Sequence, residues 1–284
     1  MKLAIITDQH FGARKGADYI HRYFKKFYDN TFFPYLEKNK IDTIVDMGDT
    51  FDNRRNIDLA TLEWSKKNYY DRLQAMGITV HTIVGNHTAY YKDTNEINTV
   101  DLLLKEYDNV EVYSEPTEIT IGGLNILMLP WINEENRSQT MEMINKSTSK
   151  VVMGHLELNG FALFPGVVQT NAHMGLNPSY FQHFDVVFSG HYHTRSNDGK
   201  IFYLGNPYLM YWNDVDDPRG FHIFDTDTFK LEFIQNPYTM FEKVYYDDTT
   251  TNYNDFDILT LTEKFVKIVV VNKKDLYQFD RFID

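Results

Sequence analysis

Short apolar runs recur through the first two thirds of the chain, and each is followed by a polar residue. Five of them have the length of β-strands: residues 3–7, 41–47, 78–84, 151–153 and 186–188. Segments with helical periodicity, 19–37 and 59–75, separate the first three runs. Strands that alternate with helices predict an α/β fold in which helices cover the sheet on both faces.

The residues that follow these runs are of the kinds that bind metal ions. They are Asp8 and His10, Asp49, Asn86 and His87, His155, and His191 with His193. In open α/β sheets the ligand site lies beyond the carboxyl ends of the strands, so these side chains are expected to converge. Imidazole, carboxylate and amide groups together suit Mn²⁺, Fe or Zn²⁺ better than Ca²⁺, which takes oxygen ligands alone.

Taken one at a time, most of these residues have an ordinary structural explanation. Asp8 alone is typical of a turn or a helix cap, and His155 alone is typical of a packed histidine. Only the pair His191 and His193 indicates a metal by itself. The whole set, each member at a strand end, favours a metal site. The remaining histidines are interpreted as structural: His21, His81, His173, His183 and His222.

Composition limits the class of protein. The net charge is −12 over 284 residues, which argues against a protein that coats DNA non-specifically, because phosphate affinity comes mainly from Lys and Arg. The chain has no cysteine, so disulfides and thiolate metal sites are excluded, and this fits a reducing cytoplasm. No apolar stretch is long enough to cross a bilayer, and no membrane partner is expected.

The pattern of the chain changes twice towards its end. From residue 200 it shows short strands with turns, and after Pro237 it becomes rich in Tyr, Asp and Thr. We predict a main domain over residues 1–236 and a small second domain over 237–284. The last residues are expected to form an amphipathic helix with four apolar side chains on one side: Leu276, Phe279, Phe282 and Ile283.

The motifs as a set resemble the full signature of the calcineurin-like metallophosphoesterases. They are Asp8-Gln9-His10, Gly48-Asp49-Thr50-Phe51-Asp52, Gly85-Asn86-His87, Gly154-His155 and Gly190-His191-Tyr192-His193. Residues 155–161, 205–207 and 217–221 are similar to the SbcD branch, the nuclease subunit of the SbcC–SbcD repair complex. Within that branch the chain most resembles the tailed-phage recombination endonuclease subunit, over nearly its whole length.

This resemblance implies a two-layer β-sandwich flanked by helices, with a small capping domain that is expected to be incomplete. It also implies two divalent ions, with Mn²⁺ preferred. The ligands of one ion would be Asp8, His10, Asp49 and His193. The ligands of the other would be Asp49, Asn86, His155 and His191, so that Asp49 bridges the two. His87 would be the catalytic histidine.

Asp52 and Thr88 are the two positions whose roles the resemblance leaves open. Many relatives have Asp where this chain has Thr88. Asp52 is therefore the candidate carboxylate partner of His87, and the alternative is that Asp52 only caps the next helix.

The implied activity is hydrolysis of DNA phosphodiesters, with 3′-to-5′ exonuclease and single-strand endonuclease action. The implied partners are DNA, an SbcC-type SMC-like ATPase and a second copy of the chain. The chain is expected to be a fragment or a short member of the family, without the region that binds the ATPase. The homodimer would use apolar helix residues: Leu59, Leu62, Tyr69, Tyr70, Ile97, Val100 and Leu103.

The alternative function is a phosphatase of the same family that acts on a small molecule or a phosphoprotein. Basic residues on the loops favour DNA, and they are the candidates for phosphate contacts: Arg14, Lys15, Arg54, Arg55, Lys92 and Arg195. Phe11, Tyr90 and Tyr91 lie on the same loops, where they would either stack on bases or pack in the core. The expected location is the cytoplasm, that of the host if a phage encodes the chain.

Overall fold

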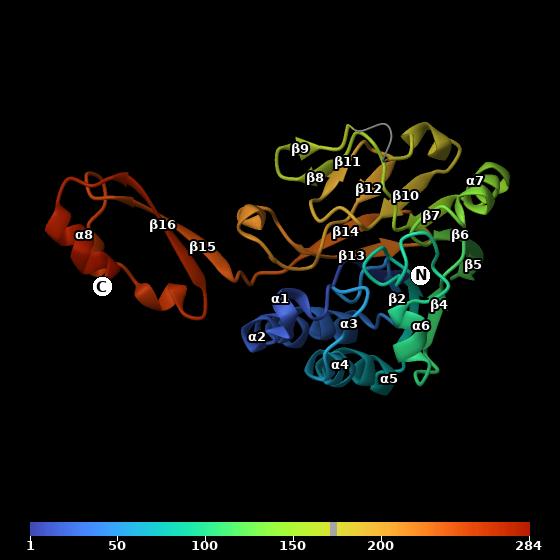
Figure 1. Cartoon of the computed structure of the whole chain (residues 1–284), viewed down its shortest axis with the longest axis horizontal. Coiled ribbons are helices and arrows are strands. Elements are labelled where there is room, and N and C mark those ends of the chain that lie inside the picture. Colours follow the sequence, from blue (N-terminus) through green and yellow to red (C-terminus); the bar gives the residue numbers. More distant parts are fainter. Residues whose placement is uncertain (171–174) are drawn as a thin grey trace. The chain divides into compact units, whose positions relative to one another are not determined.

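The computed structural model describes residues 1–170 and 175–284, which form two compact units (Figure 1). The first unit comprises Met1–Tyr208 and Asp217–Pro237, and the second comprises Leu209–Asp216 and Tyr238–Asp284. The second unit therefore includes the segment Leu209–Asp216, which the predicted division after residue 236 places in the main domain. His173 lies outside the described residues.

The first unit contains two six-stranded sheets. The strands of the first sheet are β1 (Lys2–Ile6), β2 (Thr43–Asp46), β3 (Thr79–Ile83), β4 (Val110–Tyr113), β13 (Gly220–Asp225) and β14 (Leu231–Gln235), in the order β14-β13-β1-β2-β3-β4. Those of the second are β5 (Thr117–Ile121), β6 (Leu124–Leu129), β7 (Val151–Gly154), β10 (Val186–Ser189), β11 (Ser196–Asn197) and β12 (Ile201–Tyr203), in the order β11-β12-β10-β7-β6-β5. A separate hairpin joins β8 (Ala162–Phe164) and β9 (Val167–Val168).

Four adjacent strands run parallel in each sheet, and antiparallel strands complete it. β1 to β4 are parallel, with β13 and β14 added in antiparallel pairing. In the second sheet β6, β7, β10 and β12 are parallel, with β5 and β11 antiparallel at the two edges. The parallel strands place the carboxyl ends of β1, β2 and β3 at one end of the first sheet, and those of β7 and β10 at one end of the second.

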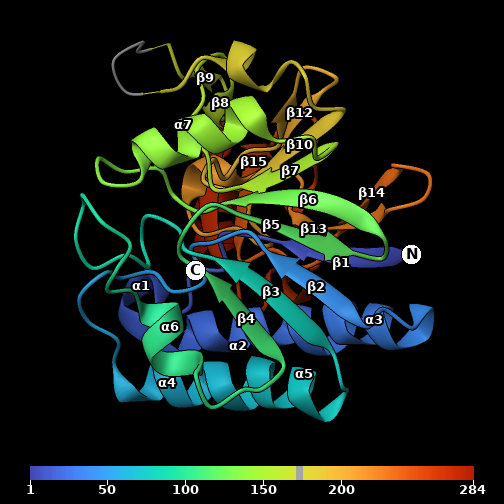
Figure 2. The ribbon, with the colours of Figure 1, turned by 90° about the vertical axis from the view of Figure 1, so that its right-hand side faces the viewer.

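Helices cover the outer face of each sheet, as Figure 2 shows. On the first sheet lie α2 (Asp18–Phe27), α3 (Phe33–Asn39), α4 (Leu59–Ser65) and α5 (Asp71–Ala75). Single wider turns, η1 (Tyr28–Phe32) and η2 (Lys66–Tyr70), join them in pairs, so the two predicted helical segments are nearly continuous. α7 (Arg137–Lys146) covers the second sheet, and α6 (Thr99–Leu104) follows β3. A short η3 (Pro178–Phe181) precedes β10.

The two sheets pack face to face around one apolar core. Leu3 and Val45 of the first sheet share a buried cluster with Met128, Val151 and Phe188 of the second. Side chains from both sheets in one cluster are the mark of a β-sandwich. The predicted two-layer sandwich flanked by helices is therefore confirmed. Among the described residues no helix combines the length and the apolar character needed to cross a membrane.

The second unit is a parallel pair of strands with a helix packed on it. β15 (Phe241–Asp247) pairs with β16 (Phe265–Asn272), and α8 (Leu276–Ile283) packs Phe279 and Phe282 against Tyr246. Leu276 and Ile283 of the predicted helix are 62% and 50% exposed. Three short turns complete the unit: η4 (Trp212–Asp214), η5 (Tyr253–Asp255) and η6 (Ile258–Leu261).

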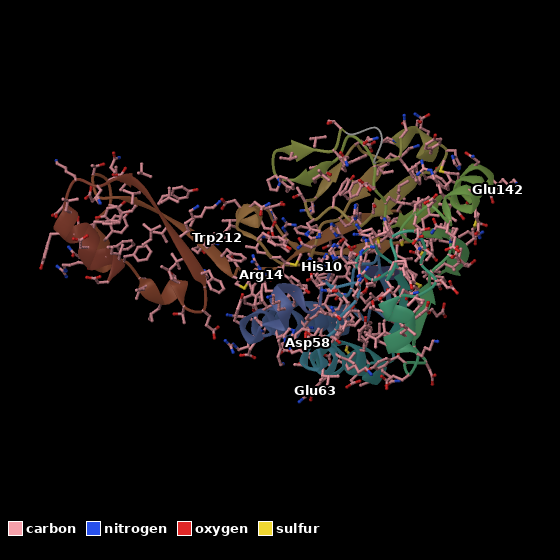
Figure 3. All side chains as sticks on the ribbon, in the orientation of Figure 1. His10, Arg14, Asp58, Glu63, Glu142 and Trp212 are labelled. Carbon is pink, nitrogen blue, oxygen red and sulfur yellow. The ribbon has the colours of Figure 1, made fainter. Side chains whose placement is uncertain are left out.

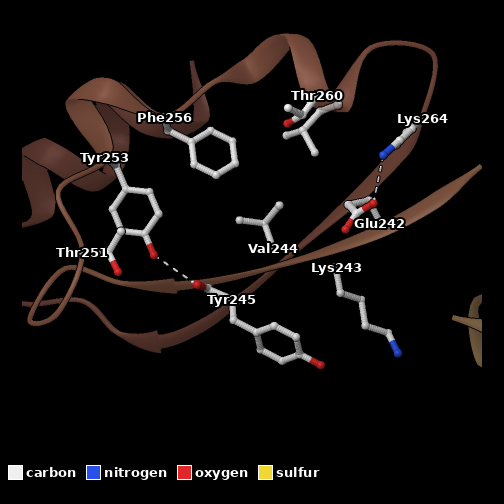
Figure 4. A pocket seen from close by; sticks show the side chains of 10 residues that line it. Glu242, Lys243, Val244, Tyr245, Thr251, Tyr253, Phe256, Thr260 and Lys264 are labelled. Atoms are coloured by element: carbon white, nitrogen blue, oxygen red, sulfur yellow. Dashed lines mark hydrogen bonds and ion pairs between the residues drawn. The ribbon is translucent and has the colours of Figure 1, made fainter. Parts of the chain in front are cut away.

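A pocket of about 390 Å³ opens beside β15 in the second unit. Lys264 bridges to Glu242 at 3.0 Å, and the Tyr253 hydroxyl donates to the main-chain oxygen of Tyr245 at 3.1 Å (Figure 4). These contacts tie the turns to the strand pair.

The inter-sheet core predicts a large cost for deleting one of its rings. Phe188 is fully buried and meets Phe224 with ring centroids 5.0 Å apart. Phe188→Ala should lower the free energy of unfolding by about 3–5 kcal/mol. The matched control, Phe164→Ala, removes a ring that is 42% exposed and should stay within about 1 kcal/mol of the wild type. Urea unfolding measures both, and equal losses would contradict the assigned core.

Candidate metal centre

Main-chain hydrogen bonds connect the loops at the carboxyl ends of the strands. The Asp8 amide donates to the oxygen of Gly48, and the His10 amide donates to that of Asp49, both at 2.9 Å. Between β7 and β10, the Gly190 amide donates to the oxygen of Gly154 at 3.0 Å. These bonds join the loop after β1 to the loop after β2, and the end of β10 to the end of β7, before any side chain is considered. His10 lies on the loop after β1, and Arg14 lies in the short turn that follows this loop (Figure 3).

Four predicted ligands have left-handed backbones, which side chains other than glycine seldom adopt. Their φ angles are 52° at Asp8, 47° at His10, 53° at Asp49 and 80° at His191. Each such residue costs on the order of 1–3 kcal/mol and persists only where its surroundings hold it. Strain of this kind clusters at functional sites, so its presence at the strand ends supports a functional interpretation.

Two glycines permit the close approach of the loops. A Cβ atom on Gly48 would lie 2.7 Å from Nδ1 of His155, and one on Gly190 would lie 2.1 Å from Oγ1 of Thr7. Any larger residue would push the strand ends apart. The glycines of the motifs are therefore required by packing as well as by the turn at Gly48, where φ is 95°.

Asp8, His10 and His193 form the first candidate group, called here the Asp8 group. Oδ1 of Asp8 lies 3.8 Å from Nε2 of His10 and 3.7 Å from Nε2 of His193, and these two nitrogens are 3.1 Å apart. Asp8 is fully buried, and its Oδ1 has no hydrogen-bond partner. The other oxygen accepts from the Thr7 hydroxyl and the His191 amide.

Asp49, His155 and His191 form the second candidate group, called the Asp49 group. Oδ2 of Asp49 lies 3.2 Å from Nε2 of His155. Oδ1 of Asn86 lies 2.9 Å from the same nitrogen and 2.8 Å from Nδ1 of His191. The structure thus brings all seven predicted ligands into two groups at the strand ends. The bridging of both metals by Asp49 stays a prediction.

Buried charges of opposite sign perturb one another strongly in the Asp49 group. Burial alone would lower the pKa of His155, but the charges of Asp49 and Asp8 outweigh it and raise that pKa to about 9. Burial would raise the pKa of Asp49, but the neighbouring His155 charge brings it well below its usual value. Burial and the charge of His155 lower the pKa of His191 to about 3. The buried carboxylates therefore favour the protonated form of the His155 ring.

The donor set fits divalent ions. An unpaired buried carboxylate oxygen of Asp8 faces two ring nitrogens that also face each other, an arrangement that a cation would stabilise. Nδ1 of His155 lies 2.8 Å from the oxygen of Met47, so its N–H points there and Nε2 is left for a metal. In the Asp49 group, a divalent ion would take the place of the proton on His155.

The structure differs from the expected pairing of the Asp52 carboxylate with His87. Nδ1 of His87 lies 2.7 Å from the main-chain oxygen of Asp52, whereas the carboxylate lies 3.1 Å from Nδ1 of His10. The chain after β2 turns so that the Asp52 carbonyl accepts from His87 while its carboxylate lies nearest His10, with a ring nitrogen of His87 also within 4.8 Å. The capping alternative does not hold either, because Asp58 caps α4 by accepting from the Thr61 amide at 2.8 Å.

The predicted DNA-contacting residues occupy different environments. Arg14, Lys15 and Lys92 are exposed, and the first two belong to the left-handed turn α1 (Ala13–Gly16). Arg195 lies over the ring of Phe233, 3.6 Å from its centroid. The remaining two, Arg54 and Arg55, lie over the rings of Trp131 and Tyr90. Phe11, considered for base stacking, is 1% exposed and belongs to the core.

Several residues that support the site carry no motif. The buried Arg219 donates to the main-chain oxygen of His193 and to Oδ1 of Asn206, which gives a physical reason for the similarity noted at residues 205–207 and 217–221. Nε2 of Gln9 donates to Asp46 at 2.9 Å. Burial raises the pKa of Asp46 to about 7. In the sequence, the only sign of this supporting role is a carboxylate, Asp46, within the apolar run that leads to Gly48.

Four of the five histidines interpreted as structural lie among the described residues. His21 and His222 are buried, His81 is partly buried and His183 is exposed. None of these four belongs to a candidate metal group within the part of the chain that the structure describes.

Comparison with protein families decides the class. A family model described as calcineurin-like phosphoesterase matches residues 1–195. The chain belongs to this family. Because the match spans every strand-end motif, the chain is a metal-dependent phosphoesterase, and divalent metal ions are its cofactors.

Two named relatives extend the comparison. The chain is 36% identical over 282 residues to a protein named exonuclease subunit 1 of Enterobacteria phage T4. The matched region covers 99% of this chain and 80% of that protein. It is 25% identical over 215 residues to a putative phosphoesterase of Invertebrate iridescent virus 3, with 72% of this chain and 57% of that protein covered. A solved dimetal phosphatase from Danio rerio is similar with a TM-score of 0.49 and 13% identity, over 78% of this chain and 91% of that one.

The two groups predict that metal binding depends on single histidines. His10→Ala should bind about one divalent ion fewer per chain than the wild type, since the Asp8 group loses one of its three members. His183→Ala, an exposed histidine outside both groups, is the control and should bind as the wild type does. Mass spectrometry of metal content after equilibration with Mn²⁺ gives the count. Unchanged content in His10→Ala would remove His10 from the ligand set.

Proposed function

We propose that this chain is a DNA nuclease that hydrolyses phosphodiester bonds at a two-metal centre. The observation that carries the proposal is the pair of adjoining Asp–His groups with His87 beside them. A dinuclear centre of this kind suits phosphoryl transfer, because two cations can stabilise both the attacking and the leaving oxygen. The 36% identity to a phage exonuclease subunit over nearly the whole chain supports DNA as the substrate.

The seven predicted ligands would hold the ions: Asp8, His10, Asp49, Asn86, His155, His191 and His193. When bound, the ions would supply Lewis acidity that lowers the pKa of water and neutralises charge on the phosphoryl oxygens. All other steps fall to the side chains of the protein.

His87 is the proposed proton donor to the leaving oxygen. Its Nδ1 donates to the main-chain oxygen of Asp52, which fixes the tautomer and leaves Nε2 free to exchange a proton. The amide of His87 also donates to Oδ1 of Asp49 at 2.7 Å. The catalytic ring is thereby tied to a metal ligand, so its position follows the metal centre.

Asp52 is proposed to act as a positioning residue for His10. The Asp52 carboxylate lies 3.1 Å from Nδ1 of His10 as an ion pair and not as a well-aligned hydrogen bond. A carboxylate beside the outer nitrogen of a metal-bound imidazole orients the ring and raises its basicity. Burial would lower the pKa of His10, but the adjacent Asp52 carboxylate raises it. This role replaces the expected pairing with the catalytic histidine.

The finer parts of the proposal are Mn²⁺ as the working ion, 3′-to-5′ exonuclease polarity and single-strand endonuclease action. An SbcC-type ATPase is the proposed partner of the nuclease, which the word subunit in the name of the phage relative supports; this chain by itself is proposed to bind that ATPase weakly or not at all. A phosphatase acting on a nucleotide monoester is the competing outcome of the assay described next.

A substitution of the proposed bridging residue tests the function. Asp49→Asn should abolish Mn²⁺-dependent cleavage of a single-stranded oligonucleotide, because neutralising Asp49 weakens the hold on the ions. Asp185→Asn, an exposed carboxylate on the surface, is the control and should cleave normally. Parallel assays use the oligonucleotide and a nucleotide monoester. Rapid turnover of the monoester with no cleavage of DNA by the wild type would replace the nuclease by a phosphatase.

The roles of Asp52 and His87 differ in their dependence on metal concentration. Asp52→Asn should lower the apparent affinity for Mn²⁺ by roughly 10–100-fold, as loss of a partner to a metal-bound histidine does, and excess Mn²⁺ should restore most of its activity. His87→Ala should keep its metals and should not recover. Titration of cleavage rate against Mn²⁺ separates the two, and failure of excess Mn²⁺ to restore Asp52→Asn would return Asp52 to a catalytic role.

We further propose a homodimer in which Leu59 and Ile97, 83% and 42% exposed, contact a second copy. Tyr69, Tyr70 and Val100 of the predicted surface are buried in the core of their own chain, so they cannot contribute. Light scattering at micromolar concentration should give twice the chain mass, and a Leu59→Glu variant should give the mass of one chain. A wild-type protein that scatters as a monomer would end this proposal.

A further inference from the structure

Two arginines that follow Asp52 contact aromatic rings. The guanidinium of Arg54 lies over Trp131, 5.0 Å from the ring centroid, and that of Arg55 lies over Tyr90 at 5.6 Å. Nη1 of Arg54 also donates to the main-chain oxygen of Tyr91 at 3.3 Å. Arg54, Arg55, Tyr90 and Trp131 are called here the arginine–aromatic cluster. Its members come from the loops after β2, β3 and β6, so both sheets contribute.

The main chain of Trp131 is held at three points. Its amide donates to the oxygen of Val84 at 2.7 Å, and its oxygen accepts from Nδ2 of Asn95 at 2.9 Å and Nδ2 of Asn136 at 3.1 Å. The indole nevertheless stays partly exposed. A large ring on a fixed backbone can bind a ligand with little ordering cost.

The cluster lies on the His87 side of the metal centre. Tyr90 lies three residues after His87 in the chain. Arg54 lies two residues after Asp52, and the main-chain oxygen of Asp52 accepts a hydrogen bond from His87. In an in-line displacement the proton donor stands near the leaving oxygen. With a DNA strand bound, the cluster would therefore adjoin the nucleotide that carries the leaving oxygen.

We propose that the arginine–aromatic cluster is a stacking surface for an unpaired base of the DNA strand, on the leaving-group side of the scissile phosphate. This inference rests on the proposed nuclease function. Aromatic rings and arginine planes stack on any base, because every base has a π-face. Bases in a duplex are stacked on one another and cannot present that face, so the surface favours single strands.

Stacking also explains how an acidic chain can hold DNA. With a net charge of −12, the protein as a whole repels phosphates, and only local cations attract them. Arginine is more weakly hydrated than lysine and combines charge with a flat surface. Arg54 and Arg55 would both attract phosphates and stack on a base, while Trp131 would supply affinity that salt does not screen.

The test measures KM and kcat for single-stranded oligonucleotides with the full chain. One oligonucleotide is intact, and the other has an abasic residue on the leaving-group side of the cleaved bond. The wild type should show a KM about tenfold higher for the abasic strand, equivalent to about 1.4 kcal/mol, with little change in kcat. Trp131→Leu should raise KM for the intact strand by a similar factor and leave the abasic strand unaffected.

Matched variants separate stacking from charge and from folding. Trp131→Phe keeps an aromatic ring and should restore much of the affinity for the intact strand. Arg137→Ala removes an exposed arginine of α7 and should leave both KM values unchanged. If Trp131→Leu does not fold, the comparison of the two strands by the wild type still decides.

The failure of this inference differs from that of the proposed function. A wild type that cleaves both strands with the same KM retains its nuclease activity and loses the stacking surface. A wild type that cleaves neither strand, with Mn²⁺ bound, removes the nuclease function itself and with it this inference.

Discussion

The confinement of two buried carboxylates among histidines at the strand ends is the constraint on which the rest of the first unit depends. Asp8 and Asp49 are 0% and 1% exposed, and an ionised carboxylate without compensation is very costly in such a place. Their backbones are also left-handed. A fold retains buried carboxylates on strained backbones where bound cations offset their charge. The parallel strands, the glycines and the main-chain hydrogen bonds between the loops keep these groups together.

A second layer of contacts orients the ligands. Carbonyl oxygens, the Asp52 carboxylate and the buried Arg219 each fix one histidine or the loop that carries it. The Gln9–Asp46 pair anchors the loop between Asp8 and His10. These supports come from positions between the motifs, and they explain why the motif residues alone do not define the site.

The sequence was sufficient to predict five of the strands, the helices on the first sheet and the convergence of the ligands, but not β4, β5, β6 or α7. These features follow from local periodicity and from the rule that parallel strands end at a common edge. The contact between Asp52 and His10 could not be predicted, because it depends on which way one peptide turns after β2. Trp131 carries no motif, and its position beside Arg54 depends on how the second sheet meets the first. The inclusion of residues 209–216 in the second unit is likewise a property of long-range packing.

The most direct test of the account is a crystal structure of the chain grown with Mn²⁺, with the ions located by their anomalous scattering. We expect two peaks per chain, one among Asp8, His10 and His193 and the other among Asp49, Asn86, His155 and His191, with Asp49 in contact with both. A single peak, or peaks away from the strand ends, would contradict the two-metal centre.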